Sequence, residues 1–538
     1  MDQTVKRKKF DKSNPIVFMF KKLWLFSEGN HKKVVLYMIL SSIAEIFYSL
    51  MPLVFAHIIN IIQLEGLSSD NLLKILLLIS GILLLEILTW AFHGPSRVME
   101  LANSFRASAR YKQYLVSGVM SLPASWHTNH HSGDTIDKIN KATSGLKQFS
   151  DRSFVVIQVL ISFLISLGAI FYFNFPSGII VLFFVFFAIY TVLRMDRLLV
   201  KRFDKQNRMQ NDISTKIYDF ISNISTVIIL RMERLASRTI TKSLFKPYKY
   251  EIQTNKVNEF KWFLVSFFVY AMIAVVLSVF IISHVVSGEI LLIGSLSALY
   301  SYSSKIGSIF YAFAYRYGDI VKWRTDVANV EGISSLFQNQ SKKKKIHLGS
   351  SWSSIFVKDL QFQYDDDKNI LHLDNVSFEL LRGQRIAFIG HSGSGKTTAL
   401  KVIREMYPSK HVELFIDGEP IEGCFSNISH TIALIPQDPE IFSSTIKENI
   451  TLGLNCSKDE LYEVMSLAKF DSVVKKLPKG LLSTTVEKGV NLSGGEKQRL
   501  ALARGLFACK DKEIILLDEP TSSVDPKNEY EIYNNIFN

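Results

Sequence analysis

Six long apolar runs crowd the first part of this 538-residue chain. They are Val34–Ile62, Leu72–Phe92, Phe154–Phe173, Gly178–Leu193, Phe263–Val286 and Ile290–Tyr315. A helix needs roughly 20 apolar residues to cross the hydrocarbon core of a bilayer, and these runs reach or nearly reach that length. Several of them are apolar on every side, which favours membrane spans over the buried helices of a large soluble protein. The shortest run is expected to continue as a helix through VLRMDRLLV.

The distribution of Lys and Arg predicts how the spans are oriented. Basic residues concentrate in the N-terminal segment and in the two long connections that follow the second and fourth runs, while the alternate connections are short and almost free of them. Positive connections face the cytoplasm, so we expect a cell (inner or plasma) membrane protein whose N-terminus and C-terminal part are cytoplasmic. Much of the net charge of +13 then reflects topology. Membrane lipid is an expected partner, and nucleic acid is not.

Beyond Tyr315 the pattern changes to short strands alternating with helices, which is typical of an α/β domain. The segments IFVKDLQFQY and VSFELL predict strands of an antiparallel layer, whereas QRIAFIG and EIILLD predict buried strands of a parallel sheet. We therefore expect four parts, a cytoplasmic segment 1–33, a transmembrane domain 34–320, a linker 321–352 and a cytoplasmic domain 353–538. The four lysines at 342–345 fit a solvated linker.

The segment GHSGSGKT fits the phosphate-binding pattern GxxxxGK[ST] between an expected strand and an expected helix. Its glycines allow backbone N–H groups to turn toward phosphate oxygens, and the helix N-terminus adds positive potential. Lys396 is expected to reach the β- and γ-phosphates of a nucleotide, and the Thr397 hydroxyl to bind Mg²⁺. The expected nucleotide-binding residues of this loop are Gly390, Ser392, Gly393, Ser394, Gly395, Lys396, Thr397 and Thr398.

Two further segments complete the expected site. EIILLDE is an apolar run that ends in two acids, of which Asp518 is expected to hold Mg²⁺ and Glu519 to orient or deprotonate the attacking water. In LSGGEKQR, Ser493 and the glutamate three residues later form a capping box, so a helix is expected to begin there. Gly494 and Gly495 leave this helix tip open to an anion, and the site makes sense if it closes on a nucleotide held by another domain.

Together, LSGGEKQR, the phosphate loop and LLDEPTSSVD resemble the ATP-binding-cassette (ABC) superfamily, over essentially all of Ile355–Asn538. The resemblance implies that Tyr364 stacks on adenine and that Gln437 contacts Mg²⁺ and the attacking water. It also implies that Ser493 and Gly495 contact the γ-phosphate of the opposite cassette, and that Asp525 lies at the dimer seam. The expected cofactors are ATP and Mg²⁺, and the catalytic residues are Glu519, Gln437 and Lys396.

Six spans ahead of one cassette resemble the exporter-type half-transporters of this superfamily. The implied fold is an all-α six-helix transmembrane bundle followed by an α/β P-loop NTPase cassette, with a parallel core sheet and an antiparallel β layer. The implied function is ATP-dependent export of an unidentified substrate by a dimer of two half-transporters, as a homodimer or a heterodimer. Coupling helices are expected near SWHTNHHSGDTIDKI and YDFISNISTVIIL, where His127, His130 and His131 fit solvated loop residues better than a metal site.

Two features of the chain leave alternatives open. In related cassettes a further strand and a switch histidine follow the SSVD segment, whereas here KNEYEIYNNIFN predicts only a helix. We therefore expect a C-terminally truncated chain, and the alternative function is an impaired ABC subunit that inserts and binds ATP but hydrolyses it poorly. Within the spans, Glu45, Glu86 and the polar side of the sixth run (Tyr300, Tyr302, Ser303, Ser304 and Lys305) fit either a substrate cavity or polar contacts between helices.

Overall fold

The computed structural model describes residues 14–130, 132–337, 348, 352–364, 371–437, 440–485 and 491–537. These residues form two compact units. The helical unit contains the described residues up to 117 and residues 136–332, and the cassette unit contains residues 118–135 and the described residues from 333 onward. The lysines at 342–345 and His131 lie outside the described residues.

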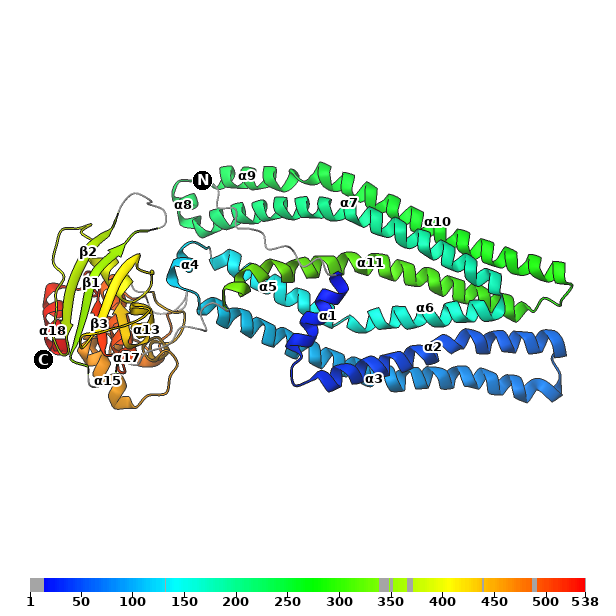
Figure 1. Ribbon diagram of the computed structural model, residues 1–538, viewed down its shortest axis with the longest axis horizontal. Coiled ribbons are helices and arrows are strands. Elements are labelled where there is room, and N and C mark those ends of the chain that lie inside the picture. Colours follow the sequence, from blue (N-terminus) through cyan, green and yellow to red (C-terminus); the bar gives the residue numbers. More distant parts are fainter. Residues whose placement is uncertain are drawn as a thin grey trace. The chain divides into compact units, whose positions relative to one another are not determined.

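The helical unit consists of helices, most of them long (Figure 1). They are α1 (Pro15–Phe26), α2 (His31–Glu65), α3 (Ser69–Met120), α5 (Ser132–Ser150), α6 (Ser153–Phe173), α7 (Phe175–Ser222), α8 (Ile224–Ile229), α9 (Glu233–Phe245), α10 (Tyr248–Ser287) and α11 (Ile293–Phe337). Several of these helices continue well beyond the apolar runs that predicted them, and α11 continues past the boundary expected at residue 320. In hydrocarbon only internally hydrogen-bonded backbone is tolerated, so uninterrupted helices are the expected solution.

Five stretches of the described chain are long and apolar enough to cross a membrane. They lie in His31–Glu65, Ser69–Met120, Ser132–Phe173, Phe175–Ser222 and Glu233–Ser287. The sixth predicted span falls mostly in α11, which begins at Ile293 and is too polar to join this set, because it carries the Ser- and Tyr-rich segment SLSALYSYSSK. Tyr302 and Ser303 of that segment are buried inside the bundle, whereas Tyr300 is 54% exposed.

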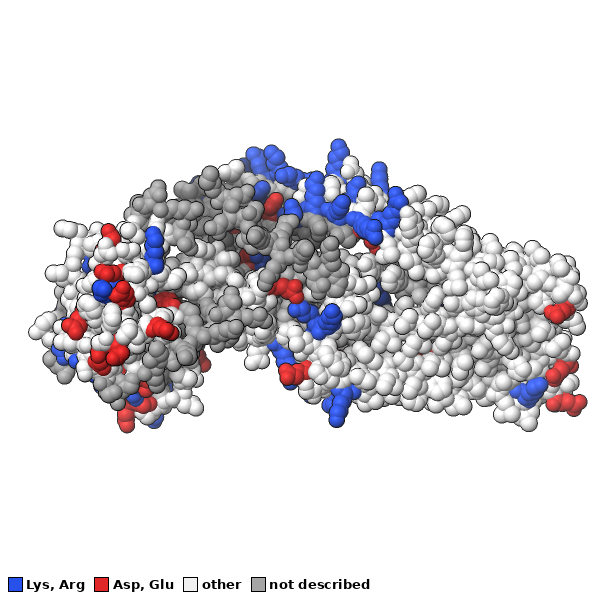
Figure 2. All heavy atoms as spheres, in the orientation of Figure 1, with Lys and Arg blue, Asp and Glu red and all other residues white. Residues whose placement is uncertain are grey.

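The visible surface of the helical unit has the charge pattern of a membrane protein. Figure 2 shows a broad band without charged side chains between the charged turn that joins α2 to α3 and a concentration of Lys and Arg farther along the helices. At that turn Lys74 forms an exposed ion pair with Glu65 (3.4 Å). An uncharged band flanked by charge matches the hydrocarbon core between two polar interfaces.

The bundle core lies between α6, α7, α10 and α11. Helices α7 and α10 lie side by side along much of their length (Figure 1). Val185 of α7, Met272 of α10 and Leu299 of α11 are among the buried residues of this core. A Cβ atom on Gly307 would lie 2.5 Å from Cγ1 of Val269, so glycine allows α11 to approach α10 closely.

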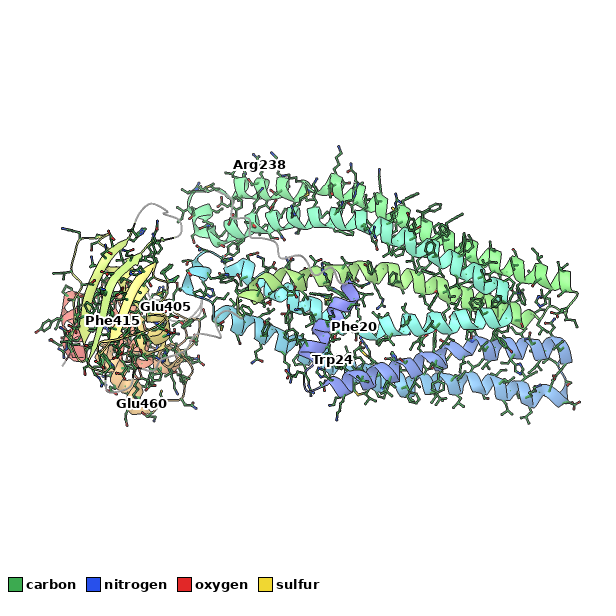
Figure 3. All side chains as sticks on the ribbon, in the orientation of Figure 1. Phe20, Trp24, Arg238, Glu405, Phe415 and Glu460 are labelled. Carbon is green, nitrogen blue, oxygen red and sulfur yellow. The ribbon has the colours of Figure 1, made fainter. Side chains whose placement is uncertain are left out.

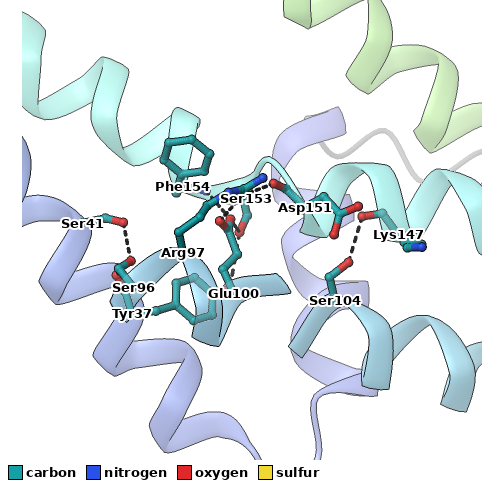
Figure 4. A network of polar contacts seen from close by, with 10 residues as sticks. All are labelled: Tyr37, Ser41, Ser96, Arg97, Glu100, Ser104, Lys147, Asp151, Ser153 and Phe154. Atoms are coloured by element: carbon teal, nitrogen blue, oxygen red, sulfur yellow. Dashed lines mark hydrogen bonds and ion pairs between the residues drawn. The ribbon is translucent and has the colours of Figure 1, made fainter. Parts of the chain in front are cut away.

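A buried carboxylate fixes the beginning of α6 (Figure 4). Glu100 of α3 is fully buried and accepts hydrogen bonds from the Ser153 hydroxyl and the Phe154 backbone N–H (both 2.8 Å). The Arg97 guanidinium pairs with Glu100 (2.5 Å) and also donates to the Asp151 carbonyl. Because these contacts satisfy N-terminal donors of α6 with a group on α3, they set the point where the chain enters the bundle.

A second buried ion pair joins three helices at the middle of the bundle. Glu45 of α2 pairs with Lys305 of α11 (3.1 Å) and accepts a hydrogen bond from Gln158 of α6 (2.9 Å). The Ser49 hydroxyl lies 2.8 Å from the Lys305 ammonium and 3.3 Å from the Glu45 carboxylate. Of the two alternatives for Glu45, a polar contact between helices is therefore present within this chain.

Glu86, the other predicted charge within a span, has a different environment. Its carboxylate accepts a hydrogen bond from the Trp90 indole one turn later on the same helix (2.8 Å). Trp90 is 61% exposed in this chain, so the pair lies on the outer side of α3.

Helix α1 was not predicted from the sequence, and aromatic side chains hold it in place. Figure 3 shows Phe20 and Trp24 on this helix. The Phe20 ring meets Phe149 of α5 edge to face at 5.1 Å, and Trp24 stacks on His31 at 4.1 Å. With 12 residues, α1 is too short to stand out as an apolar run of membrane-spanning length.

The cassette unit contains two sheets. The antiparallel sheet has the order β2–β1–β3–β4, and the parallel sheet pairs β5 with β6, with Ile432 opposite Ile514 and Ile435 opposite Leu517. The strands are β1 (Ser354–Phe362), β2 (Leu373–Leu381), β3 (His411–Ile416), β4 (Glu419–Pro420), β5 (Ile432–Ile435) and β6 (Ile514–Leu517). The structure thus has both the antiparallel layer and the parallel pairing predicted for EIILLD.

The remaining elements of the cassette unit are short helices. They are α4 (Ala124–Thr128), α12 (Lys396–Ile403), α13 (Phe425–Ile428), α14 (Ile446–Thr451), α15 (Lys458–Leu467), α16 (Asp471–Val474), α17 (Gly494–Ala508) and α18 (Pro526–Phe537), with 3₁₀ turns at Ser429–Thr431 and Gly480–Leu482. Helix α18 occupies the segment KNEYEIYNNIFN, as predicted. Helices α4 and α8 occupy the two segments where short coupling helices were expected.

One strand prediction was wrong. The segment QRIAFIG, residues 384–390, belongs to neither sheet of the described structure, and its side chains are exposed, Ile389 by 93%. A strand exists only where a neighbour completes its hydrogen bonds, and no described strand pairs with this segment. The burial predicted for β6 is also only partial, because Ile515 is 47% exposed.

Removing the cation of the central ion pair should destabilise the bundle. In Lys305→Met the Glu45 carboxylate keeps only hydroxyl and amide donors, and breaking a buried pair in this way costs about 3–5 kcal/mol. We expect a clear fall in the thermal unfolding midpoint of the purified protein in detergent. The double variant Glu45→Gln/Lys305→Met, which leaves no buried charge, should recover most of the loss.

The matched control is Lys74→Met at the exposed Lys74–Glu65 pair, where both side chains are about half exposed. Exposed pairs contribute about 0–1 kcal/mol, so this variant should unfold close to the parent. An equal, small effect of Lys305→Met and Lys74→Met would contradict a structural role for the buried pair.

Candidate functional site

The phosphate-binding loop lies against the start of β2 and leads directly into α12. Gly393 and Gly395 have positive φ angles of 83° and 91°, which favour glycine. A Cβ atom on Gly395 would lie 3.0 Å from the Leu373 side chain and 3.1 Å from the His372 carbonyl, so the loop depends on glycine there for space as well. A tightly packed turn therefore leads directly into the first turn of α12. The backbone N–H groups of that first turn can bind an anion.

Other residues of the loop hold its shape. The Ser394 N–H donates to the His391 carbonyl (3.1 Å), and a Cβ atom on Gly390 would lie 2.7 Å from the Ser394 hydroxyl. Ser392 is exposed, while Thr398 is half-buried in the first turn of α12. The Lys396 ammonium donates to the carbonyls of Gly390 (2.8 Å) and His391 (3.0 Å), which keeps its charge at the mouth of the loop.

A hydrogen bond joins the loop to the end of β6. The Thr397 hydroxyl donates to Oδ1 of Asp518 (2.8 Å), across 121 positions of sequence. Asp518 is buried, and its backbone N–H donates to the Ile435 carbonyl at the end of β5 (3.0 Å). Hydroxyl and carboxylate oxygens are the ligands that Mg²⁺ prefers, so this pair fits the metal predicted there.

Glu519 and Gln437 follow the ends of β6 and β5, and their side chains meet. The Gln437 amide donates to Oε2 of Glu519 (3.0 Å). Glu519 has a φ angle of 46°, a conformation that is rare for residues other than glycine. Such strain is held by its surroundings and clusters at functional sites. The parallel pairing of β5 and β6 thus brings two of the three predicted catalytic side chains, Gln437 and Glu519, to the end of the strands where Asp518 lies.

The signature segment begins α17 as predicted. The Ser493 hydroxyl accepts from the Glu496 N–H (3.3 Å), and the Ser493 N–H donates to the Glu496 carboxylate (2.8 Å). The hydrogen bond from the Ser493 backbone lowers the pKa of Glu496 below its usual value. A Cβ atom on Gly495 would lie 2.8 Å from the Ser523 carbonyl, whereas Gly494 has space around it. Glycine at 495 is therefore needed for packing within the chain, in addition to any contact with an anion.

Asp525 lies at the beginning of α18. Its carboxylate accepts hydrogen bonds from the side chain (2.7 Å) and the backbone N–H (3.1 Å) of Asn528. These bonds, chiefly that from the Asn528 side chain, lower the pKa of Asp525. Within the chain Asp525 thus caps a helix, and its predicted role at a dimer seam stays a prediction.

Tyr364 lies at the edge of an aromatic cluster beside the phosphate loop. It is half-buried, and its ring meets Phe362, His372 and Tyr407 edge to face at 4.7, 4.8 and 5.2 Å. Because the His372 carbonyl also approaches Gly395, the cluster connects Tyr364 to the loop. This place is consistent with a ring that stacks on the base of a nucleotide.

Gln498 was not predicted as a site residue, although it connects three site segments. Its buried amide donates to the Ser522 hydroxyl (2.9 Å) and the Gln437 carbonyl (3.3 Å), and its oxygen accepts from the Ser523 N–H (2.7 Å). The signal available in the sequence was its place in LSGGEKQR, less than two helical turns after Ser493. Nothing in that pattern indicates which segments it contacts.

The histidines in the long connection after the second apolar run make local contacts. His127 contacts the Val119 carbonyl (3.1 Å), and His130 contacts the Trp126 carbonyl (2.8 Å) and stacks on its ring. In the described part of the chain no group of three or more His, Cys, Asp and Glu side chains could hold a metal ion.

Known proteins resemble this chain along most of its length. "ATP-binding cassette sub-family B member 6" of Xenopus tropicalis is 27% identical over 78% of this chain and 49% of its own length. "Multidrug resistance-like ATP-binding protein MdlB" of Buchnera aphidicola is 24% identical over 95% of this chain and 87% of its own length. This chain spans about half or less of the length of several curated relatives that it matches.

A solved structure has the same fold. The structure of a bacterial Atm1-family ABC exporter with ATP bound superposes with a TM-score of 0.81, covering 94% of this chain and 89% of that chain at 20% sequence identity. It agrees with the fold predicted from the sequence, a mostly helical transmembrane region followed by an α/β cassette.

Two family models match the two parts of the chain separately. Residues 373–522 match the ABC transporter model, and residues 34–309 match the model of the ABC transporter transmembrane region. The second match alone covers more than half of the chain, and the phosphate loop, the acid pair and the signature segment lie in the first. The chain therefore belongs to the ABC transporter family and is a multi-pass membrane protein.

Proposed function

We propose that this chain is a subunit of an exporter that uses ATP hydrolysis to move a substrate across a membrane. The observation that carries the proposal is the convergence of Thr397, Asp518, Gln437 and Glu519 beside the phosphate loop, with contacts of 2.8 and 3.0 Å. These are the groups that phosphoryl transfer to water requires, namely oxygen ligands for a metal and a carboxylate near an amide. The helical unit with its long apolar spans supplies the membrane part.

Each group of the site has a distinct chemical role in the proposal. Lys396 and the N–H groups at the start of α12 bind phosphate oxygens, while Thr397 and Asp518 supply oxygen ligands to Mg²⁺, with Gln437 close by. When bound, Mg²⁺ neutralises charge on the phosphates of ATP. Gln437 holds Oε2 of Glu519, so that the other carboxylate oxygen is available to orient a water molecule and accept its proton.

The proposal includes a second subunit. The Ser493 helix tip presents backbone donors next to the SSVD segment, and in the described structure its closest neighbour there is Ser523 rather than the phosphate loop. A tip of this kind is suited to an anion supplied by another cassette. We therefore propose a dimer, most simply a homodimer, in which Ser493, Gly494 and Gly495 close the site of the partner and Asp525 lies near the seam.

The positive connections support a cell membrane location with the cassette in the cytoplasm. Among the relatives, one is named for multidrug resistance and another is an "Iron-sulfur clusters transporter". These names differ in cargo, and the substrate class of this chain stays open among lipids, peptides and hydrophobic drugs.

Glu519→Gln should separate ATP binding from hydrolysis. The substitution keeps the shape and the contact to Gln437, and it removes the carboxylate that accepts a proton, so turnover should fall by roughly 10²-fold or more. We expect the purified full chain in lipid nanodiscs to retain ATP while its phosphate release nearly stops. Glu419→Gln, at an exposed acid of β4, is the matched control and should keep the parental rate.

Parental turnover in Glu519→Gln would contradict the role of this residue. A parent protein with no measurable ATP turnover in nanodiscs would contradict the proposed function itself and favour the impaired-subunit alternative.

Shared sites can be tested by distributing two lesions over a dimer. When one subunit carries Lys396→Ala and the other Ser493→Arg, a shared arrangement leaves one site with both lesions and one site intact. When a single subunit carries both changes opposite a parental subunit, a shared arrangement leaves a lesion in each site. We therefore expect turnover in the first mixed dimer and little in the second, measured after purification by two different affinity tags.

Sites contained within single subunits predict the opposite ranking, because only the second mixed dimer then has an undamaged subunit. That reversed result would exclude sharing. The two single-variant homodimers, one with Lys396→Ala in both subunits and one with Ser493→Arg in both, are the controls. They show that each lesion alone abolishes turnover.

A further inference from the structure

An apolar cavity of about 360 Å³ lies in the helical unit, lined mainly by α6, α7 and α11. The wall from α6 includes Val155, Val159 and Phe163, and the opposite walls include Val185 of α7 and Phe313 of α11. The volume is at the lower end of the range of about 300–1,000 Å³ that is usual for ligand cavities. The described lining residues include two charged side chains, both arginines.

Arg152 and Arg316 carry two positive charges, and among the described residues one carboxylate, that of Asp319, lies near both. Arg152, which precedes α6, lies 3.9 Å from Asp319 and 5.8 Å from the centre of the Trp323 ring. Arg316 of α11 makes no hydrogen bond or ion pair with any described residue. The nearby acid whose charge attracts it is Asp319, three residues later on the same helix. Two guanidinium groups therefore face one carboxylate.

A second acid in this region is already neutralised. Asp196 of α7 forms a buried ion pair with Lys261 of α10 (3.0 Å), so its charge is not available to the arginines. Among the described residues, one positive charge at this end of the cavity thus has no matching acid, which fits an anionic group.

The level of the arginines along the helices fits the headgroup region of a bilayer. Arg152 comes just before the apolar run Phe154–Phe173, and Arg316 comes just after Ile290–Tyr315. Trp323, next to them in the lining, is of the type enriched at membrane interfaces. The apolar walls therefore lie at hydrocarbon depth and the charges at the interface.

The cavity is open toward the outside of the helical unit. Leu160 of α6 and Ile189 of α7, both lining residues, are 59% and 38% exposed. An apolar rim of this kind allows a lipid chain to enter from the side.

We propose that this cavity binds one anionic glycerophospholipid of the bilayer, with its phosphate on Arg152 and Arg316 and an acyl chain along the apolar walls. Guanidinium groups bind phosphate through paired hydrogen bonds, and two of them give a preference for anionic headgroups. A neutral hydrophobic ligand has no use for the arginines, and a soluble phosphate has no use for the walls. The site is separate from the nucleotide site and does not depend on ATP turnover.

Native mass spectrometry of the full-length protein measures this binding without nucleotide. The parent, exchanged into detergent with phosphatidylglycerol or phosphatidylcholine, should retain one phosphatidylglycerol per subunit in preference to phosphatidylcholine. Each basic residue near a membrane surface contributes about fivefold in binding, so Arg152→Gln/Arg316→Gln should weaken phosphatidylglycerol retention roughly 30-fold. The matched control, Arg234→Gln/Arg238→Gln on exposed positions of α9 (Arg238 in Figure 3), should retain it like the parent.

A further variant tests the apolar walls without changing charge. Ala312→Phe places a ring in the cavity and should displace the lipid while both arginines remain. The unfolding midpoint of every variant is measured alongside, and if the double arginine variant does not fold, Ala312→Phe decides.

Three results would overturn the proposal. Equal retention of both lipids would show a cavity without headgroup selection. Displacement of the lipid by inorganic phosphate alone would show a soluble-anion site. A parental dimer that retains no phosphatidylglycerol would show that a second copy of the chain, rather than lipid, covers the cavity.

Discussion

Polar groups that lie away from water must find their partners inside the chain, and this requirement shapes the whole helical unit. Hydrocarbon offers no hydrogen bonds, so the backbone closes its own in long helices. The few buried charges are matched in the same way, Glu45 with Lys305, Asp196 with Lys261 and Glu100 with Arg97. The first two pairs join different helices, and Glu100 and Arg97 of α3 also contact the start of α6 and the residue before it, so the cost of burying these charges is offset only in one arrangement of the bundle. We infer that these pairs specify how the helices are arranged more than they add to stability.

The arginines at the end of the apolar cavity depart from this rule. Arg152 and Arg316 have one carboxylate between them, and they lie where the spans leave the hydrocarbon. At that level an external anion can supply the negative charge that the described part of the chain does not. Elsewhere in the bundle, the need to pair buried charges is met within the chain. In our proposal, the same need at Arg152 and Arg316 is met by a phospholipid from the membrane.

The cassette uses polar groups in the opposite way and keeps several of them available at one edge. Parallel pairing of β5 and β6 brings Gln437, Asp518 and Glu519 to the same end of the strands, where Thr397 meets them from the phosphate loop. Gln498 then ties this edge to the signature helix and to the SSVD segment. The signature helix is therefore joined directly to the edge that carries Gln437 by side-chain hydrogen bonds of Gln498. The positive φ of Glu519 indicates that the surrounding contacts, rather than local preference, hold the catalytic carboxylate.

Local patterns in the sequence were enough to predict five long apolar helices, the phosphate loop and the Ser493 capping box, because each depends on residues a few positions apart. The nucleotide-site residues were predicted from their motifs, but the contact of Thr397 with Asp518 across 121 positions came only from the fold. The partner of Glu45 lies on a helix far along the chain, and the role of Gln498 depends on three segments that meet in space. The failed strand at residues 384–390 shows the same limit, since an apolar run becomes a strand only beside a neighbour that can accept its hydrogen bonds. Sequence alone therefore determined the motifs and most of the long helices of this protein. The tertiary structure decided which apolar runs become strands and which side chains meet, because burial and hydrogen bonding between distant segments have no local signature.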